Sequence, residues 1–192
     1  MRRDGPRPHP RPRRHRRRPA LLTSIAGRGC ETGQVEPETV THPPEALGRP
    51  ADPAARRLLA EAGLPRALIG VFFAADRLEP PPAGTPGIVP ADHLVLGRSR
   101  EGDLLCLHLP SGEVLLVEPR GLMEVSLVNT TLGRFLECAA LVRDRYPFSF
   151  ADPGGAADAL EAALEALDPA CLPADGFWDC LLSDIANGDH SG

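Results

Sequence analysis

Apolar residues in the middle of the chain fall into runs of strand length. Residues 103–109 and 113–118 are two such runs on either side of a Pro-Ser-Gly turn, which is typical of a β-hairpin because glycine supplies the positive φ of a tight loop. Residues 93–99 are predicted as a strand that leads into the hairpin, and residues 123–128 as a strand that follows it. The apolar run 67–73 is predicted as a buried strand, although by periodicity alone it also fits part of a helix.

The first strand of the predicted hairpin is apolar on both sides. One face holds Leu105, Leu107 and Leu109, and the other holds Leu104, Cys106 and His108. Successive side chains of a strand point to opposite faces. The pattern therefore favours central strands that helices cover on at least one side over a sheet with one solvated face.

Helical spacing of apolar residues flanks the predicted strands. Asp52 and Pro53 are typical of the start of a helix and Gly63 of its end. Further along, apolar residues recur at i, i+3, i+4 and i+7 within 129–146, 156–168 and 177–188, and Trp178 is predicted to be a core residue of the last helix. The order helix, strands, helices predicts an α+β domain with an antiparallel-rich central sheet and helices packed on it.

Charge is divided unevenly along the chain. Residues 1–30 hold ten arginines against Asp4, a net charge of +9, so the whole-chain value of −5 leaves −14 for residues 31–192. Three interpretations of the basic start remain open. It could be an arm for nucleic acid or an anionic membrane, a targeting segment, or translated upstream DNA that follows a misplaced start codon.

Composition also sets the expected domain boundary. The first twenty residues are rich in arginine and proline and have no apolar period, so they cannot bury enough surface to fold. Residues 31–51 continue as a linker rich in proline, threonine and glutamate. We therefore predict a disordered Arg/Pro-rich tail and linker over residues 1–50 and a single domain over residues 51–192.

The sequence predicts neither a secretion signal nor a membrane span. Ala20–Ala26 is only seven residues long and contains two hydroxyl residues, and Arg28 stands where a cleavage site needs a small residue. No run approaches the roughly 18 apolar residues of a membrane-spanning helix. The five cysteines are odd in number and lack a C-x-x-C pair, as expected of reduced core residues. We expect a cytoplasmic protein.

Candidate catalytic and metal-binding residues are few. Cys106 and His108 lie two apart and so share a strand face, but a Cys-His dyad would also need a third, orienting group and a pocket. His93 and His108 could bind a metal, yet no set of Cys, His or Asp has zinc spacing. The sequence therefore predicts no catalytic residue, no metal and no cofactor, and an enzyme is not expected.

Four motifs occur in order between residues 55 and 188. They are AEAGLP before an apolar strand, LVLGRSREGDLLCLHLPSGEVLLVEP as strand and hairpin, VNTTLGRFLECAALV as an asparagine-led helix, and a closing FWDCLLSDIANG. Together they resemble the SUKH superfamily, specifically its fourth class of bacterial immunity proteins. The resemblance implies an α+β domain that has no activity of its own and neutralises a cognate secreted toxin. Many toxins of this type are nucleases or nucleobase deaminases. The arginine tail and the linker are not part of the family pattern.

Six carboxylates are candidates for binding the partner. Four occupy one stripe of the helix within 156–168, opposite its leucines, and two lie near the hairpin; they are Asp158, Glu161, Glu165, Asp168, Glu113 and Glu118. An acidic stripe suits a toxin that acts on nucleic acid and is therefore basic, because complementary charge speeds encounter and favours the right partner. A solvated face that serves only solubility is the alternative.

Two other functions remain beside a monomeric, toxin-binding immunity protein. A nucleic-acid-binding regulator would use the basic N-terminal arm, and its affinity would fall steeply with salt. A hydrolase would use Cys106 and His108, with a cleft and a thiol of lowered pKa. Deleting residues 1–50 separates the first two, because toxin neutralisation should survive the deletion and binding through the arm should not.

Overall fold

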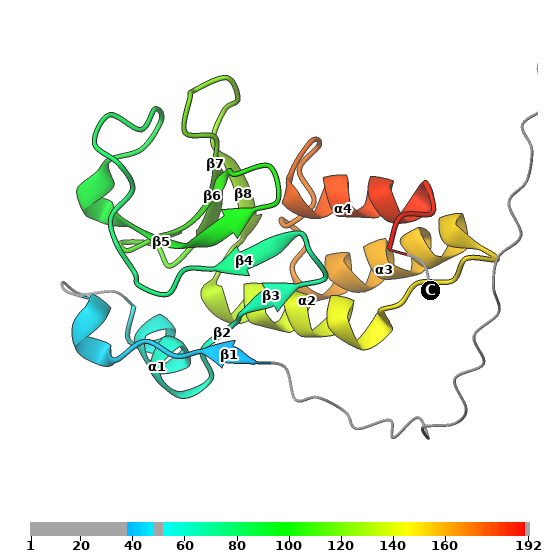
Figure 1. The fold of residues 1–192 in the computed structure, drawn as a ribbon, viewed down its shortest axis with the longest axis horizontal. Helices are drawn as coiled ribbons and strands as arrows, with labels where there is room; N and C mark the ends of the chain where they lie inside the picture. The colour runs from blue at the N-terminus through cyan, green and yellow to red at the C-terminus, as the bar shows by residue number, and fades with distance from the viewer. Residues whose placement is uncertain (1–37, 48–51, 191–192) are drawn as a thin grey trace, which may run out of the picture. The chain divides into compact units, whose positions relative to one another are not determined.

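The structure of the protein is a computed structural model that describes residues 38–47 and 52–190 (Figure 1). These residues belong to one compact unit, Glu36–Gly192. The predicted disordered tail and linker cover residues 1–50, of which 1–37 and 48–50 lie outside the described residues, so that part of the prediction stays a prediction.

The strands of the described residues form two antiparallel sheets. The larger has the order β3-β4-β5-β6-β7-β8, so each strand pairs with the next along the chain (Figure 1). Its strands are β3 (Ala67–Leu68), β4 (Phe72–Ala74), β5 (His93–Ser99), β6 (Leu104–His108), β7 (Val114–Val117) and β8 (Ser126–Asn129). The smaller sheet pairs β1 (Thr39–Val40) with β2 (Leu64–Pro65). The predicted antiparallel-rich sheet and its central hairpin are confirmed.

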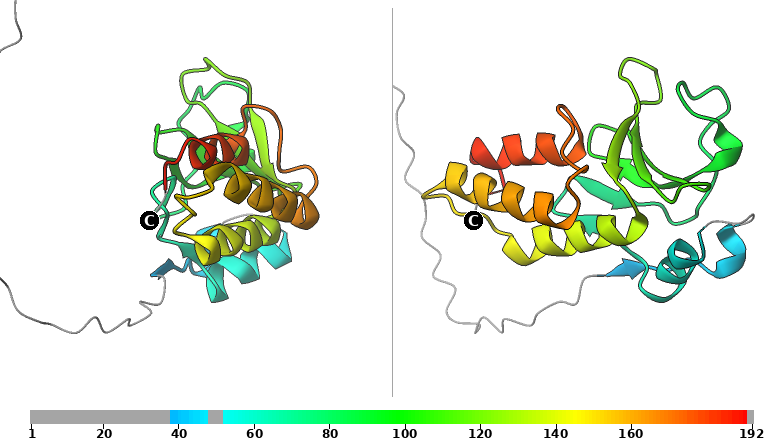
Figure 2. Two further views of the ribbon diagram at one scale, coloured as in Figure 1. Left: turned by 90° about the vertical axis from the view of Figure 1, so that its right-hand side faces the viewer. Right: turned by 180° about the vertical axis from the view of Figure 1, so that it is seen from behind.

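Helices complete the α+β fold. Within the described residues these are α1 (Pro53–Glu61), α2 (Leu132–Arg145), α3 (Pro153–Leu167) and α4 (Phe177–Ala186), with the short 3₁₀ helices η1 (Pro44–Leu47) and η2 (Pro90–Asp92). Figure 2 shows α2, α3 and α4 lying together beside the sheet, with α3 next to α4. The predicted fold class is confirmed, including the order of helix, strands and helices.

Short polar side chains fix where three helices begin. Asp52 accepts hydrogen bonds from two backbone N–H groups in the first turn of α1. Thr131 accepts one in the first turn of α2, and Asp152 one in the first turn of α3. These N–H groups have no partner within the helix, so each cap satisfies a donor that would otherwise need water. The cap predicted at Asp52 is confirmed.

The apolar run 67–73 is a tight hairpin. Leu68 of β3 pairs with Phe72 of β4, and Ile69 and Gly70 between the strands have φ of +37° and +82°. Positive φ at both central residues gives a turn whose twist matches that of the paired strands. The single buried strand expected there is wrong, because the glycine lets the chain reverse direction inside the apolar run.

The sheet buries side chains on both faces. In β6, Leu105 and Leu107 join the main core, which they share with the helices. Leu104 and Cys106 join a smaller cluster on the opposite face. Partly buried side chains from the β4–β5 and β7–β8 loops pack against this second cluster. The apolar pattern of the hairpin thus reflects helices on one face and loops on the other.

Residues 38–47, which composition assigned to the linker, contain β1 and η1. Val40 and His42 are buried, and the backbone N–H of His42 donates to the carbonyl of Leu59 in α1 at 2.9 Å. Burial also lowers the pKa of the His42 side chain. The described fold therefore includes contacts made N-terminal to residue 51, and a truncated form that preserves them has to keep residue 38 onward.

Candidate functional site

Three of the predicted carboxylates lie on the exposed surface of α3. Asp158, Glu161 and Glu165 are exposed, whereas Leu160 and Leu164 on the other side of the helix are fully buried. This division follows from the helical period, which places residues three and four apart on one face. The structure therefore brings these three charges together where solvent or a partner can reach them.

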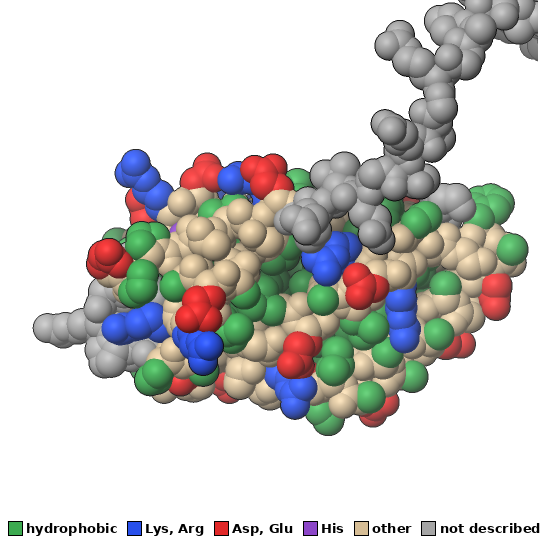
Figure 3. Space-filling view, turned by 90° about the horizontal axis from the view of Figure 1, so that it is seen from below, with side chains coloured by type: hydrophobic (Ala, Val, Ile, Leu, Met, Phe, Trp, Pro, Cys, Tyr) green, Lys and Arg blue, Asp and Glu red, His purple; other side chains and the backbone are tan. Residues whose placement is uncertain are grey.

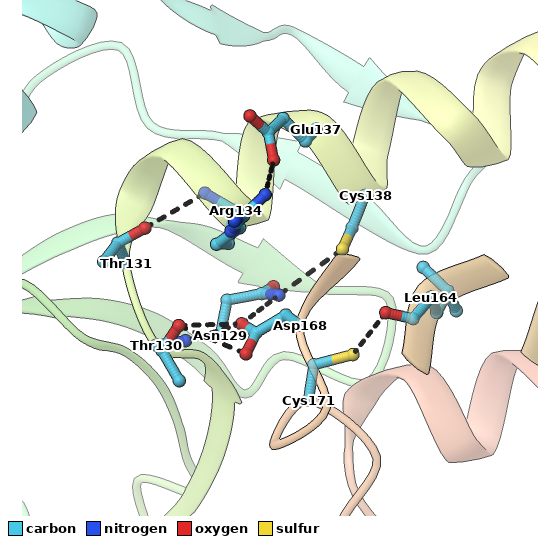
Figure 4. Close-up of polar contacts among 9 residues, drawn as sticks. All are labelled: Asn129, Thr130, Thr131, Arg134, Glu137, Cys138, Leu164, Asp168 and Cys171. Carbon is cyan, nitrogen blue, oxygen red and sulfur yellow. Dashed lines mark hydrogen bonds and ion pairs between the residues drawn. The ribbon is translucent and has the colours of Figure 1, made fainter. Parts of the chain in front are cut away.

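Asp168, the fourth member of the predicted stripe, is buried, with 3% of its surface exposed. Its carboxylate accepts hydrogen bonds from Asn129 Nδ2 at 3.0 Å, from the Thr130 N–H at 2.8 Å and from the Thr130 hydroxyl at 3.1 Å (Figure 4). Asp168 directly follows α3, and its N–H still donates to the carbonyl of Leu164 at 2.9 Å. It therefore lies one helical turn after a buried leucine, on the buried side of the helix. Asp168 ties the end of α3 to the end of β8 and does not belong to the exposed acidic surface.

The hydrogen bonds of Asp168 continue into the core through Asn129. Trp178 Nε1 in α4 donates to Asn129 Oδ1 at 3.0 Å, and Asn129 Nδ2 contacts Cys138 Sγ in α2 at 3.5 Å (Figure 4). Asn129, Cys138 and Trp178 are fully buried. Since a polar group without a partner is costly in such surroundings, this network fixes how β8, α2, α3 and α4 meet.

Glu118, a predicted partner-binding residue, is 7% exposed and fixes the loop that follows β7. Its carboxylate accepts hydrogen bonds from the N–H and Nε of Arg120, at 3.0 and 2.8 Å, and from the N–H of Leu122 at 2.7 Å. These donors, the Arg120 side chain first, keep the pKa of Glu118 below its usual range. Glu118 thus acts on its own loop, where the large side chains of Leu122 and Met123 are exposed.

Glu113, the last predicted carboxylate, belongs to the hairpin turn. The Ser111 hydroxyl donates to Glu113 Oε2 at 2.7 Å and lies 2.7 Å from His108 Nδ1. Because that hydroxyl has one proton and gives it to a carboxylate, His108 Nδ1 is the donor in the second contact. The six predicted carboxylates therefore occupy separate places: the surface of α3, the buried network, the loop after β7 and the hairpin turn.

Cys106 and His108 are not arranged as a catalytic dyad. Cys106 is fully buried, and burial raises the pKa of its thiol to about 12, so the nucleophilic thiolate is not formed at neutral pH. His108 directs Nδ1 to Ser111 instead. Among residues 38–47 and 52–190, no group of three or more His, Cys, Asp and Glu side chains is placed to hold a metal ion.

A pocket lined by apolar and acidic residues lies beside α4; we call it the α4 pocket and its charged lining residues the rim. Its volume is about 320 Å³. Leu116 of β7, Leu181 of α4 and Met123 of the loop after β7 are among the apolar residues that line it. Its charged residues are the carboxylates Glu101, Asp103, Asp175 and Asp184 and the guanidinium of Arg100. The pocket thus combines apolar surface with an excess of negative charge.

Two titratable groups in the α4 pocket have a raised pKa, first because of burial and then because of nearby carboxylates. Burial raises the pKa of Asp103, and the carboxylates of Glu118 and Glu101 raise it further. Burial also raises the pKa of the Cys180 thiol, and the charges of neighbouring aspartates, Asp179 first, add to the effect. Of the cysteines that the structure describes, Cys180 is the exposed one, so its thiol can report on the pocket.

The face on which α1 and α2 lie has a different distribution of charge. In Figure 3 its arginine and acidic side chains stand next to one another among hydrophobic ones. Exposed ion pairs explain this pattern, with Arg57 2.9 Å from Glu61 and Arg134 2.6 Å from Glu137. Such pairs largely balance their own charge and stabilise the fold little. The α4 pocket differs because four carboxylates there face one guanidinium.

These features define a class of protein. The chain folds as an α+β domain with two groups of acidic side chains, one on the exposed surface of α3 and one that lines the α4 pocket. Within the described residues, no helix is long and apolar enough to span a membrane.

A family model described as SUKH-4 immunity protein matches residues 18–184. Because the match covers most of the chain, the protein belongs to the SUKH-4 immunity protein family. Comparisons with curated proteins and with solved structures gave no match.

Proposed function

We propose that this SUKH-4 immunity protein binds and neutralises a cognate secreted bacterial toxin through protein–protein contact. It acts as a monomer in the cytoplasm. The observation that carries the proposal is the family match over residues 18–184, since it assigns the chain to a family of immunity proteins. Neutralisation by binding needs a folded surface but no catalytic nucleophile. The burial of Cys106, the candidate nucleophile, agrees with this.

The toxin is expected to be basic, as a nuclease or a nucleobase deaminase would be. Enzymes that act on nucleic acid present lysine and arginine to its phosphates. The immunity protein carries the opposite charge, with −14 over residues 31–192 and three exposed carboxylates on α3, Asp158, Glu161 and Glu165. Complementary charge raises the rate of encounter and disfavours wrong partners. We assign these three residues to steering the toxin toward the binding surface.

Co-expression tests the proposed function. The gene next to the one that encodes this protein is cloned as the candidate toxin and expressed with the full-length chain. Restored growth and co-purification of the two proteins support the proposal. A matched form that lacks residues 1–37 keeps β1 and is expected to rescue equally well. Growth that stays arrested with both forms, although both are folded and expressed, would contradict toxin neutralisation.

The ten arginines in residues 1–30 favour one alternative function, binding of nucleic acid by a regulatory protein. Arginine contacts to phosphate release counterions, so affinity would fall steeply between 50 and 200 mM salt. Fluorescence anisotropy with a duplex oligonucleotide measures this directly for the full-length chain and for the form that lacks residues 1–37. Binding that disappears with the truncation supports this second function.

A further inference from the structure

The α4 pocket has the size of a site for one large side chain. Its volume of about 320 Å³ lies at the lower end of the range of roughly 300–1,000 Å³ for ligand pockets. Leu116 and Leu181 line it from β7 and α4, and Met123 lines it from the loop after β7. An apolar group that enters the pocket removes this surface from water, which favours binding.

The rim of the α4 pocket selects the charge of what enters. Four carboxylates line the pocket, whereas Arg100 is the one guanidinium among its lining residues. Arg100 Nε lies 4.0 Å from Glu101 Oε1, which leaves an excess of negative charge on the rim. An anion would be repelled, and an uncharged apolar group would take water away from carboxylates without replacing its hydrogen bonds.

An arginine side chain satisfies both the apolar lining and the acidic rim. Its methylene stem can lie against apolar surface while its guanidinium stays at the polar edge. The guanidinium is planar, less strongly hydrated than an ammonium group and able to donate two hydrogen bonds to one carboxylate. We therefore propose that the α4 pocket receives an arginine side chain of the cognate toxin. This proposal rests on the proposed function and adds where the toxin is bound and by which chemistry.

The loop that leads to Met123 is held by hydrogen bonds within this chain. Glu118 accepts hydrogen bonds from the backbone N–H groups of Arg120 and Leu122. The backbone of Leu122, directly before Met123, is therefore held in place. A preformed wall reduces the conformational entropy lost on binding. In this arrangement Glu118 positions the wall of the pocket, and the carboxylates of the rim contact the toxin.

Cys180 provides a direct test because it lines the pocket and is exposed. The protein is prepared as the full-length chain with Cys30→Ser, which removes the cysteine outside the described residues. Alkylation of Cys180 by iodoacetamide is followed by mass spectrometry, alone and with an excess of the toxin encoded by the adjacent gene. We expect bound toxin to slow alkylation at least about tenfold, because the reagent then has to wait for dissociation.

A double variant tests the chemistry of the rim. Glu101→Gln with Asp175→Asn removes two negative charges from exposed positions, and asparagine tolerates the positive φ of +58° at position 175. We expect dissociation of the toxin to be at least about tenfold faster, since lost contacts to a desolvated charge act mainly on the dissociation rate. The matched control, Glu45→Gln with Glu79→Gln, removes the same charge from exposed positions outside both the α4 pocket and α3 and should leave the dissociation rate within about twofold.

The outcomes separate this proposal from the proposed function. A toxin complex that forms while Cys180 alkylates at its free rate overturns the α4 pocket and leaves toxin binding intact. A rim variant that dissociates no faster than the Glu45→Gln, Glu79→Gln control overturns the arginine contact in the same way. If the full-length chain neither rescues growth nor binds the toxin, the proposed function fails, and the assignment of the pocket fails with it.

Discussion

The carboxylate of Glu118 satisfies three donors of one short loop. We predict that Glu118→Gln lowers the melting temperature at pH 7 by a few degrees, because an uncharged amide accepts these hydrogen bonds less strongly. Hydrogen exchange at the N–H of Leu122 should accelerate in the same variant, which shows that the loop itself has loosened. The same substitution at the exposed Glu165 is the control and should change the melting temperature by less than about one degree.

The Glu118 interaction also depends on pH in a defined direction. The donors lower its pKa from the ordinary 4.5, so the folded protein favours the carboxylate more than the unfolded chain does. Its stabilising effect is complete above pH 4.5 and is lost as the pH falls through the lowered value. The difference in melting temperature between wild type and Glu118→Gln should therefore shrink in acid. A difference that grows in acid would contradict this assignment.

Trp178 donates its indole N–H to the buried Asn129. Trp178→Phe should lower the free energy of unfolding by about 2–4 kcal/mol, because it leaves Asn129 Oδ1 without this donor and opens space in the core. Urea denaturation followed by circular dichroism measures the change. Phe150→Leu is the control, since Phe150 is 77% exposed and its substitution should change stability by less than about 0.5 kcal/mol. Equal stabilities for the two variants would exclude a structural role for the network.

The thiol of Cys180 reports the charge of the α4 pocket in the absence of any toxin. Burial and then the neighbouring aspartates, Asp175 among them, raise its pKa. Asp175→Asn should lower that pKa, so more thiolate is present at pH 8 and alkylation becomes about twofold faster. Glu165→Gln on α3 should leave the rate unchanged. A rate that falls in Asp175→Asn would show that the substitution closes the pocket rather than changing its charge.

Single residues were predictable from sequence where the regular period continues. Trp178 lies in the core of α4, and Glu161 and Glu165 are exposed on α3, as helical spacing predicts. The prediction failed at Asp168, which lies one turn after the buried Leu164 and accepts hydrogen bonds from the end of β8. It failed at Glu118 because this carboxylate lies just beyond the end of β7 and accepts from backbone N–H groups of its own loop. A carboxylate directly after a strand, as Glu118 is, is a candidate for capping its own loop before it is a candidate for binding a partner.

At the scale of the elements, Gly97 permits the close approach of β4 and β5. The pairing of β5 with β6 shifts register between Val95 and Gly97, and a Cβ atom at position 97 would overlap the carbonyl of Phe73 and the ring of Phe72. Gly97→Ala should therefore lower the free energy of unfolding by about 1–3 kcal/mol. Chemical denaturation measures it against Gly154→Ala as the control.

The control Gly154→Ala should change the free energy of unfolding in the opposite direction. Gly154 lies in the first turn of α3, and a Cβ atom there would contact nothing within 4 Å. Alanine in its place restricts the unfolded chain without strain, so Gly154→Ala should raise the free energy of unfolding by about 0.4–1 kcal/mol. If Gly97→Ala and Gly154→Ala both lose stability, the overlap of the new methyl group with Phe72 and Phe73 is not the cause of the loss at position 97.

Elements were predictable where turn residues and apolar spacing agree. The hairpin of β6 and β7 and the start of α1 combine both, and the structure confirms them. The hairpin of β3 and β4 could not be predicted, because its turn is itself apolar apart from one glycine. Nor could β1, since two residues carry too little pattern and its pairing with β2 depends on a contact some 25 residues away in the chain.

At the scale of the whole molecule, the α4 pocket could not be predicted from sequence. Its lining comes from the β5–β6 turn, the strand β7, the loop after it and the start of α4, and only the folded chain brings these segments together. The acidic surface of α3 was predictable, because one helix carries it. A binding surface built from several elements needs tertiary structure, whereas a charge pattern on one element is visible in its period.

The exposed carboxylates of α3 should act on the rate of association. We predict that Asp158→Asn, Glu161→Gln and Glu165→Gln together slow association of a basic toxin by about three- to tenfold at low salt. The dissociation rate should change little, because charges outside the direct contact attract the partner mainly before it docks. Surface plasmon resonance with the toxin encoded by the adjacent gene, at 50 and 300 mM NaCl, measures both rates.

Salt decides between steering and direct contact in that experiment. At 300 mM NaCl the screening length is well below 10 Å, so the triple variant and the wild type should associate at similar rates if α3 only steers the toxin. A faster dissociation rate at both salt concentrations would place α3 inside the interface, since short-range contacts are screened far less. The same measurement on Glu101→Gln with Asp175→Asn should show a large increase in the dissociation rate at both salt concentrations. The reason is that the rim of the α4 pocket is proposed to bind the toxin directly.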